Sequence, residues 1–258
     1  MTYLPPQQPR VVCTIEARMT SSRLPGKVLM PAAGKPLLQI LIERLKRVKR
    51  LDGIVLATTV NSKDDALAKL GQAAGIQVFR GSEDDVLGRV CGALQSANAD
   101  VCVEITADCP LMDPALVEEA IAEYFRTEQN NRYISNADPH RSVPDGLDIQ
   151  VFSAHALYHL AEQTRDPLDR EHVSYGFYRP ESGNTWAPRW ITHAATRGAE
   201  SLSLTLDYPE DYELIRRCHE SLSAVSTTYG AKDIIDWVRA HPELEEPCIS
   251  ARRTKLNA

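Results

Sequence analysis

A ten-residue segment near the start of the chain, residues 18–27, is rich in groups that bind phosphate. It carries three cations and two adjacent hydroxyls: Arg18, Ser21, Ser22, Arg23 and Lys27. Arginine offers forked hydrogen bonds to phosphate oxygens, lysine adds a point charge, and hydroxyl and backbone N–H groups complete the solvation. The segment matches neither a Walker A loop nor a G-x-G-x-x-G fingerprint. It indicates a triphosphate site, with a solvated basic turn as the alternative.

Two aspartates, Asp108 and Asp207, each follow an apolar run. Carboxylate oxygens of this kind bind Mg²⁺, which would neutralise a triphosphate and stabilise the leaving pyrophosphate. Each aspartate also precedes a proline by two residues, so a turn or a helix cap is the competing interpretation for either one alone. As a pair, together with the basic segment, they favour a metal site.

The elements that must position these groups follow from hydrophobic periodicity. Short β-branched runs predict strands, and apolar spacings of three and four predict helices. The expected strands are 11–15, 54–59, 77–80 and 101–105, and the expected helices are 37–50, 64–74, 84–97 and 114–125. This alternation predicts an α/β fold with a mainly parallel sheet and helices on both faces. Ligands of such folds bind beyond the carboxyl ends of the strands, where the basic segment and Asp108 lie.

The second half of the chain is less regular. We expect short strands within 132–151, a turn with two carboxylates at Asp145 and Asp148, and a loop-rich stretch over 180–196. A helix over 153–162, a strand over 202–206 and helices over 209–224 and 231–240 complete the prediction. The expected organisation is a flexible tail over 1–10, one domain over 11–246 with an accessory or dimerisation element at about 130–200, and a loose tail over 247–258.

Composition narrows the class of protein. The 258 residues are 43% hydrophobic and 25% charged, with a formal net charge of −6, which is ordinary for a globular chain but argues against a nucleic-acid partner. The six cysteines form no C-x-x-C pair, so a zinc site is not expected. We expect a reduced, cytoplasmic protein. No apolar run is long enough for a membrane-spanning helix, and the first residues lack the apolar core of a signal peptide.

Longer motifs resemble one known family. The run from Ile15 to Pro36 is similar to the nucleotide-binding signature of the cytidylyltransferases, in particular the spore-coat polysaccharide type related to the enzymes that activate KDO and acylneuraminates. The resemblance spans roughly residues 11–217, and its further motifs lie at 57–61, 79–89, 106–111, 144–148, 170–173 and 204–211.

The resemblance implies a fold of the nucleotide-diphospho-sugar transferase type, a GT-A-like Rossmann arrangement. It also implies a homodimer that transfers CMP from CTP to a small acidic acceptor with Mg²⁺. The phosphates would be bound by Arg18, Ser21, Ser22, Arg23 and Lys27, the cytosine and ribose would lie near Ala17, Arg80 and Ser82, and the metal would be held by Asp108 and Asp207. Arg18, Lys27 and the two aspartates would be catalytic. The acceptor would contact Asn136, Asp145, Asp148, Arg170, Glu171 and His172.

Four positions depart from the family pattern. Glu16 stands where Gln is usual, Thr20 and Ala107 where Gly is usual, and Ser203 where Arg is frequent. Glu16 brings a negative charge that needs a compensating cation or an outward orientation, and Ser203 removes a charge that could bind the acceptor. The acceptor therefore stays open between a 2-keto sugar acid and a phosphate or phosphonate. Two rival functions are a glycosyltransferase of related fold and a non-catalytic nucleotide-binding regulator.

Overall fold

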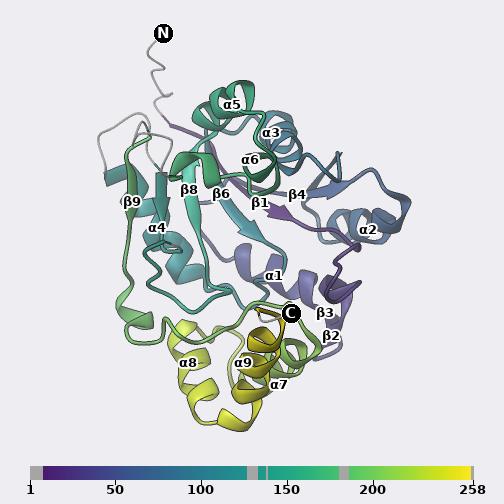
Figure 1. Cartoon of the computed structure of the whole chain (residues 1–258), viewed down its shortest axis with the longest axis vertical. Coiled ribbons are helices and arrows are strands. Elements are labelled where there is room, and N and C mark those ends of the chain that lie inside the picture. Colours follow the sequence, from purple (N-terminus) through teal and green to yellow (C-terminus); the bar gives the residue numbers. More distant parts are fainter. Residues whose placement is uncertain (1–7, 127–132, 138, 180–185, 257–258) are drawn as a thin grey trace.

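The first half of the chain alternates strands and helices as predicted (Figure 1). The computed structural model describes residues 8–126, 133–137, 139–179 and 186–256. The elements of this half are β1 (Val11–Glu16), β2 (Pro31–Ala32), β3 (Lys35–Pro36), α1 (Leu37–Leu45), β4 (Gly53–Thr59), α2 (Asp65–Ala73), β5 (Gln77–Gly81), α3 (Val86–Ser96), β6 (Val101–Thr106) and α4 (Pro114–Arg126).

The second half adds short strands and a group of C-terminal helices. Its elements are β7 (Tyr133–Ser135), β8 (Gln150–Ser153), α5 (Ala154–Gln163), α6 (Pro167–Glu171), β9 (Pro188–Trp190), α7 (Pro209–Val225), α8 (Ala231–Arg239) and α9 (Pro242–Leu256). Helices α7, α8 and α9 lie together at one end of the molecule, below α1 in Figure 1.

A seven-stranded sheet of order β5-β4-β1-β6-β8-β7-β9 organises the described residues. Strands β5, β4, β1 and β6 are parallel neighbours, β8 is antiparallel to β6 and to β7, and β9 is parallel to β7. The prediction of a mainly parallel α/β sheet is confirmed. Strands β1 and β6 lie at its centre, so the loops that follow them share the middle of the carboxyl edge.

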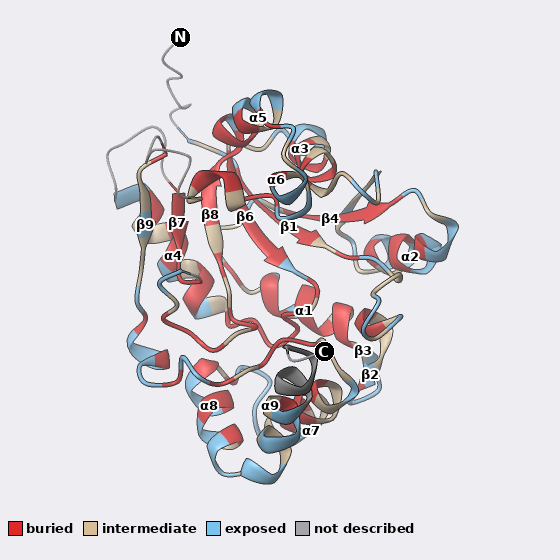
Figure 2. Ribbon diagram, viewed as in Figure 1, coloured by how far each residue is buried: buried red, intermediate tan, exposed pale blue. Residues whose placement is uncertain are grey.

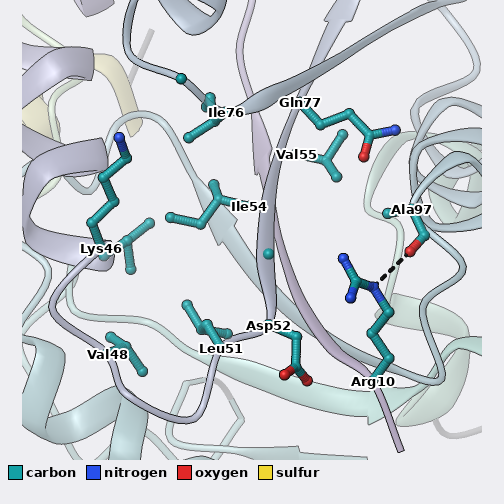
Figure 3. Close-up of a pocket in the computed structure, with 13 residues that line it drawn as sticks. Arg10, Lys46, Val48, Leu51, Asp52, Ile54, Val55, Ile76, Gln77 and Ala97 are labelled. Carbon is teal, nitrogen blue, oxygen red and sulfur yellow. Dashed lines mark hydrogen bonds between the residues drawn. The ribbon is translucent and has the colours of Figure 1, made fainter.

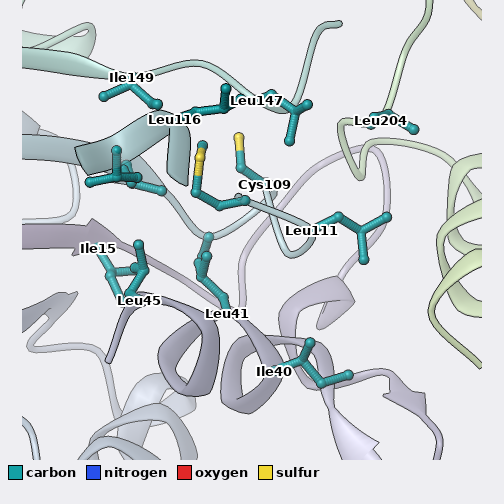
Figure 4. Packing of buried hydrophobic residues seen from close by; sticks show 14 of the residues in the cluster. Ile15, Ile40, Leu41, Leu45, Cys109, Leu111, Leu116, Leu147, Ile149 and Leu204 are labelled. Atoms are coloured by element: carbon teal, nitrogen blue, oxygen red, sulfur yellow. The ribbon is translucent and has the colours of Figure 1, made fainter. Parts of the chain in front are cut away.

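Helices cover both faces of this sheet, as predicted (Figure 2). Alternate residues of a strand point to opposite faces, and here Cys13 and Ile15 belong to one buried cluster while Val12 belongs to the other. The first cluster packs against α1 and α4, and the second packs against α3 and α5. Figure 4 shows Cys109 and Leu111, which follow the predicted metal ligand Asp108, within the first cluster. The loop after β6 is therefore anchored in the core.

The predicted strand 202–206 is wrong. Only an isolated bridge from Ser203 to Asp145 joins this segment to other strand-like backbone among the described residues. Its backbone groups bond to loops instead, since Leu204 N donates to Asp145 O (2.6 Å) and Leu206 N donates to Asp108 O (2.9 Å). The apolar alternation reflects burial of Leu202, Leu204 and Leu206 rather than membership of the sheet.

Both predicted tails need correction. The loose tail expected at 247–258 is instead helical as far as Leu256 in α9, with the buried Cys248 in the main core. At the other end, residues 1–7 lie outside the described residues, but Arg10 is fixed because its backbone N donates to Asp100 (2.7 Å) and its Nε donates to Ala97 O (2.9 Å). The predicted helix 37–50 ends at Leu45, and turns complete the segment.

Within the described residues, no helix is both long and apolar enough to cross a membrane.

Candidate active site

A cavity of about 530 Å³ lies at the carboxyl ends of β1 and β6. Ten of the predicted site residues line it: Ala17, Arg18, Ser21, Ser22, Arg23, Lys27, Asp108, Asp148, Glu171 and His172. The last two are exposed at its rim. The strand-end position is where a parallel sheet places its ligand, so the topology alone brings together groups more than a hundred residues apart.

The basic loop after β1 is a compact turn rather than a solvated extension. Gly26 has a left-handed φ of 73°, which glycine adopts at little cost, and its N–H donates to Met19 O (3.0 Å). Met19 N donates to the buried carboxylate of Asp64 (2.7 Å), and the Thr20 hydroxyl donates to Glu83. The departure at Thr20 thus adds a contact that ties the loop to residues after β5.

Lys27 joins the loop to both predicted metal ligands. Its buried Nζ lies 3.2 Å from Asp108 Oδ2, 2.9 Å from Asp207 Oδ1 and 2.5 Å from the Leu206 carbonyl oxygen. Arg23 lies 2.6 Å from the same Asp207 oxygen. Cations and carboxylates from three distant segments therefore meet at one place, with their charges mutually compensated. This arrangement excludes the reading of the segment as an isolated surface turn.

Neither aspartate acts as a helix cap. The side chain of Asp211 accepts the backbone N–H groups of Asp207 and Tyr208 at 2.9 Å each, at the start of α7. Before α4, the Asp113 side chain accepts from Ala115 N at 2.9 Å. Because other acids do this work, the capping interpretation is wrong for both. Asp108 lines the cavity, whereas Asp207 is not one of its lining residues and is joined to it through Lys27.

The two carboxylates suit a hard cation. No group of three or more His, Cys, Asp or Glu side chains in the described ranges is arranged to hold a metal ion. A bound Mg²⁺ would rest on Asp108 and Asp207 and take its other oxygen ligands from phosphate and water, which is how Mg²⁺ binds in many nucleotide sites. Their shared contact with Lys27 Nζ marks the position as one that already favours positive charge.

The turn that carries Asp145 and Asp148 packs against the segment before Asp207. Gly146 has φ 98°, and a Cβ atom there would meet the Leu204 carbonyl carbon at 2.4 Å, so glycine is required. Asp148 lines the cavity and lies 2.5 Å from Arg141. Burial raises the pKa of Asp148 to about 7, against the lowering effect of Arg141. Asp145 forms the bridge to Ser203 and does not line the cavity.

Besides Asp145 and Asp207, four predicted residues do not line the cavity: Asn136, Arg170, Arg80 and Ser82. The buried Asn136 side chain donates from Nδ2 to Leu147 O (3.1 Å), and its Oδ1 accepts from Ile149 N (2.8 Å). Arg170 binds Asp85 (3.3 Å) and Ala161 O (2.8 Å). Neither residue lines the cavity, and their polar atoms bond to backbone groups and, for Arg170, to the Asp85 carboxylate. Their assignment to the acceptor stays a prediction.

The predicted base-binding side chains are also engaged elsewhere. Arg80 donates to Thr59 O and Asn61 O at 2.8 Å each and pairs with Asp65 (2.7 Å). The Ser82 hydroxyl accepts from Asp85 N (3.1 Å). Arg80, at the end of β5, and Ser82, in the turn between β5 and α3, therefore do not line the cavity.

The floor of the cavity contains polar residues that the sequence analysis did not assign to the site. Glu16, Glu104 and Gln150 line it from β1, β6 and β8, and Arg89 and Tyr178 face it from α3 and the segment after α6. An acid inside the apolar run Val101–Ile105 was the available signal for Glu104.

A second cavity, of about 340 Å³, lies at the opposite, amino ends of β4 and β5 (Figure 3). Its two cations are held by backbone carbonyls, Arg10 by Ala97 (2.9 Å) and Lys46 by Ala74. It is remote from the strand ends that carry the candidate site.

Comparisons with known proteins agree with this geometry. Residues 12–226 match the family model described as cytidylyltransferase. The spore coat polysaccharide biosynthesis protein SpsF of Bacillus subtilis is 30% identical over 238 residues, covering 90% of this chain and 95% of that protein. The 8-amino-3,8-dideoxy-manno-octulosonate cytidylyltransferase of Shewanella frigidimarina is 34% identical over 250 residues, covering 92% and 94%. A solved cytidylyltransferase from Leptospira borgpetersenii superposes with a TM-score of 0.84 at 29% identity, covering 92% of this chain and 96% of that one.

Proposed function

This chain belongs to the cytidylyltransferase family, and on that premise we propose that it transfers CMP from CTP to a small acidic acceptor and releases pyrophosphate. The observation that carries the proposal is the meeting of Lys27 and Arg23 with Asp108 and Asp207 beside one cavity at the strand ends. A triphosphate brings several negative charges, and a cluster of fixed cations with two metal-binding carboxylates suits it.

In the proposed reaction an acceptor oxygen attacks the α-phosphorus of CTP in line with the departing pyrophosphate. A phosphate or phosphonate oxygen attacks as the anion, and a sugar hydroxyl releases its proton to water as the new P–O bond forms. The bond from the α-phosphorus to the bridging oxygen breaks, and that oxygen keeps the electron pair. Arg18, Arg23 and Lys27 would bind the phosphates and offset the charge that develops on the leaving group. Ser21 and Ser22 would donate further hydrogen bonds from the same loop. The protein contributes mainly orientation and charge stabilisation.

Mg²⁺ is the cation that we propose for this site, held by Asp108 and Asp207. When bound, it would supply positive charge to the phosphate oxygens and so favour departure of pyrophosphate. Lys27, now between the two carboxylates, is placed to turn from them toward a phosphate once a metal compensates the acids. The same side chain therefore links metal binding to nucleotide binding.

The acceptor is proposed to be a sugar acid, or a phosphate or phosphonate compound. The relative from Shewanella is named for an amino sugar acid, which supports the first class. A phosphate or phosphonate oxygen is already anionic and needs no strong base, which keeps the second class open. Asp148, Glu171 and His172 line the part of the cavity where an acceptor would approach.

The test is pyrophosphate release from CTP, UTP, ATP and GTP against a panel of acceptors. The panel consists of matched pairs that differ in one amino group: 8-amino-3,8-dideoxy-manno-octulosonate with 3-deoxy-manno-octulosonate, phosphoethanolamine with propyl phosphate, and 2-aminoethylphosphonate with propylphosphonate. We expect release that needs CTP, Mg²⁺ and one acceptor class. CTP binding without turnover of any acceptor would favour a nucleotide-binding regulator, and hydrolysis or transfer of a nucleotide sugar would favour a glycosyltransferase.

A further inference from the structure

Two acids, Glu16 and Glu104, lie side by side on the floor of the cavity. Thr14 of β1 is in register with Glu104 of β6, and Glu16 is two residues further along β1. Residues two apart on a strand point to the same face, so both carboxylates project from the face that α3 covers. Both residues line the 530 Å³ cavity. They lie beyond the apolar part of that face, where Val12 and Cys102 pack under α3.

The carboxylate groups of these acids are buried without an ion-pair partner among the described residues. Glu104 is only 6% exposed, and its Oε2 has no hydrogen-bond partner among the described residues. Both carboxylate oxygens of Glu16 are buried, and within the same described ranges neither has a partner. No ion pair to either acid is found there. A buried carboxylate in this condition is costly, so a group that enters the cavity and carries positive charge would be strongly favoured.

Their protonation reflects this environment. Burial raises the pKa of Glu16 to about 7, and burial followed by the charge of Glu16 raises the pKa of Glu104. The Thr14 side chain and, to a smaller extent, the Arg89 charge lower the pKa of Glu16 but do not restore its ordinary value. Arg89 lines the same cavity but forms no ion pair with either acid; its Nη1 donates to Ser82 O (2.5 Å) and Glu83 O (3.4 Å).

The cations of the basic loop do not form ion pairs with Glu16 or Glu104 either. Lys27 and Arg23 pair with Asp108 and Asp207, and Arg18 lies 4.0 Å from Glu83. Tyr178, which also lines the cavity, offers an aromatic ring of the kind that attracts cations. One part of the cavity is therefore built for anions and the adjoining floor for a cation.

We propose that the acceptor carries a protonated amine and that Glu16 and Glu104 bind this amine on the cavity floor. The inference rests on the proposed function and narrows its acceptor to zwitterions. Such an acceptor attacks through an anionic or hydroxyl oxygen and is bound by the enzyme through its ammonium group. The ammonium keeps its protons and takes no part in bond making. Hydrogen bonds and charge from the two acids hold the acceptor so that its oxygen faces the α-phosphorus.

The experiment compares the two members of each matched acceptor pair by kcat/KM for pyrophosphate release with CTP. Wild-type protein should prefer the amino member of at least one pair by about 10- to 100-fold, the range expected for hydrogen bonds to a charged group. In the Glu16→Gln and Glu104→Gln variants this preference should fall toward about equal use, mainly through the KM of the amino acceptor, while the Kd for CTP changes by less than about twofold.

Glu162→Gln is the matched control, because Glu162 is exposed on α5, outside the cavity. It should keep the wild-type preference. Gln has nearly the shape of Glu, and a thermal melt confirms that each variant is folded. The Kd for CTP, measured by calorimetry, shows whether a variant has lost nucleotide binding or only the binding of the acceptor amine.

Equal use of both members of every pair by the wild-type protein would overturn this inference and leave the proposed function standing. A change in the ratio of CTP to UTP binding in Glu16→Gln, with the amine preference intact, would instead assign Glu16 to the cytosine amine and also overturn it. Absence of CTP binding, or of pyrophosphate release with any acceptor, would reject the proposed function and this inference together.

Discussion

The two ends of the cavity handle charge in opposite ways. At the end that we propose binds phosphate, called the phosphate end, Lys27 and Arg23 contact Asp108 and Asp207 at 2.6–3.2 Å, so both aspartates have a cation. On the floor, Glu16 and Glu104 are buried with oxygens that have no partner among the described residues. The same sheet edge thus carries one compensated cluster and one uncompensated pair.

The difference teaches what each end requires of a ligand. A compensated cluster folds stably by itself and can exchange partners, since an incoming metal and phosphate replace its internal ion pairs. An uncompensated acid pair lowers stability until a cation arrives or the acids are protonated. Under the proposed function, the compensated end would be preorganised to bind phosphate and metal, and the floor would select the acceptor by its charge.

The largest expected effect is at the compensated end. Asp108→Asn should lower kcat for pyrophosphate release by about 10²- to 10³-fold, because it weakens the proposed metal site and the charge that positions Lys27. The check is steady-state kinetics with saturating CTP and Mg²⁺. Asp236→Asn is the control, since Asp236 pairs with Lys232 on an exposed face of α8. Full turnover by the Asp108 variant would show that the two ends do not differ as described.

Lys27→Met should lower kcat/KM for CTP by about 10²-fold and also destabilise the folded protein by about 1–3 kcal/mol. The stability loss arises because Asp108, Asp207 and the Leu206 carbonyl lose a shared donor. Kinetics and urea unfolding at pH 7.5 test the two effects. Lys232→Met, which removes an exposed lysine, is the control, and a Lys27 variant as stable as this control would contradict the compensation of the cluster.

The raised pKa of the floor acid Glu16 should make the stability of the folded protein depend on pH. The folded protein holds the Glu16 proton up to about pH 7, whereas the unfolded chain releases it near the ordinary value of 4.5. The folded state therefore binds more protons between these values, so its free energy of unfolding is highest below about pH 4.5 and falls by about 1–3 kcal/mol as the pH rises to 7. Asp148, whose pKa is also raised to about 7, adds a fall of the same sign.

Urea unfolding of the ligand-free protein from pH 4.5 to 8 measures this slope. The Glu16→Gln, Glu104→Gln double variant should show a shallower fall and should be more stable than wild type at pH 8, because it buries no charge there. A double variant with the wild-type slope would show that the floor acids are compensated after all.

The smallest effect on turnover is expected from residues that only support the cavity. Arg170→Ala should destabilise the protein by about 1–2 kcal/mol, since Arg170 joins Asp85 to the carbonyls of Ala161 and Thr164. The KM of any acceptor should stay within about twofold. Thermal melts and steady-state kinetics check both expectations. An acceptor KM that rises tenfold with unchanged stability would show that Arg170 binds the acceptor.

The sequence was most informative where chemistry and strand order coincide. That the basic loop, Asp108 and Asp207 meet could be predicted because they follow strands or apolar runs, and parallel topology brings such ends together. Asn136 and Arg170 could not be judged in this way. Their role depends on which carbonyls lie within reach, and only the packed structure supplies that information.

Two predictions that the structure contradicts also depended on packing that the sequence alone does not show. Leu202–Leu206 alternates like a strand, but its backbone partners are the loops after β6 and before β8. The segment 247–258 was predicted to be a loose tail, yet it is helical as far as Leu256 in α9, with Cys248 buried in the core. The floor acids were missed because a single glutamate within an apolar run is interpreted locally as part of a strand, whereas its partner on the neighbouring strand becomes visible only in register.

The most direct test is a crystal structure of the protein with Mg²⁺ and a CTP analogue that cannot be cleaved between its α- and β-phosphorus atoms. We predict that the triphosphate contacts Arg18, Arg23 and Lys27, that the metal lies on Asp108 and Asp207, and that Glu16 and Glu104 face unfilled cavity beside the α-phosphate. A triphosphate bound away from Lys27, or a cytosine seated on the two glutamates, would contradict the division of the cavity into a phosphate end and an acceptor floor.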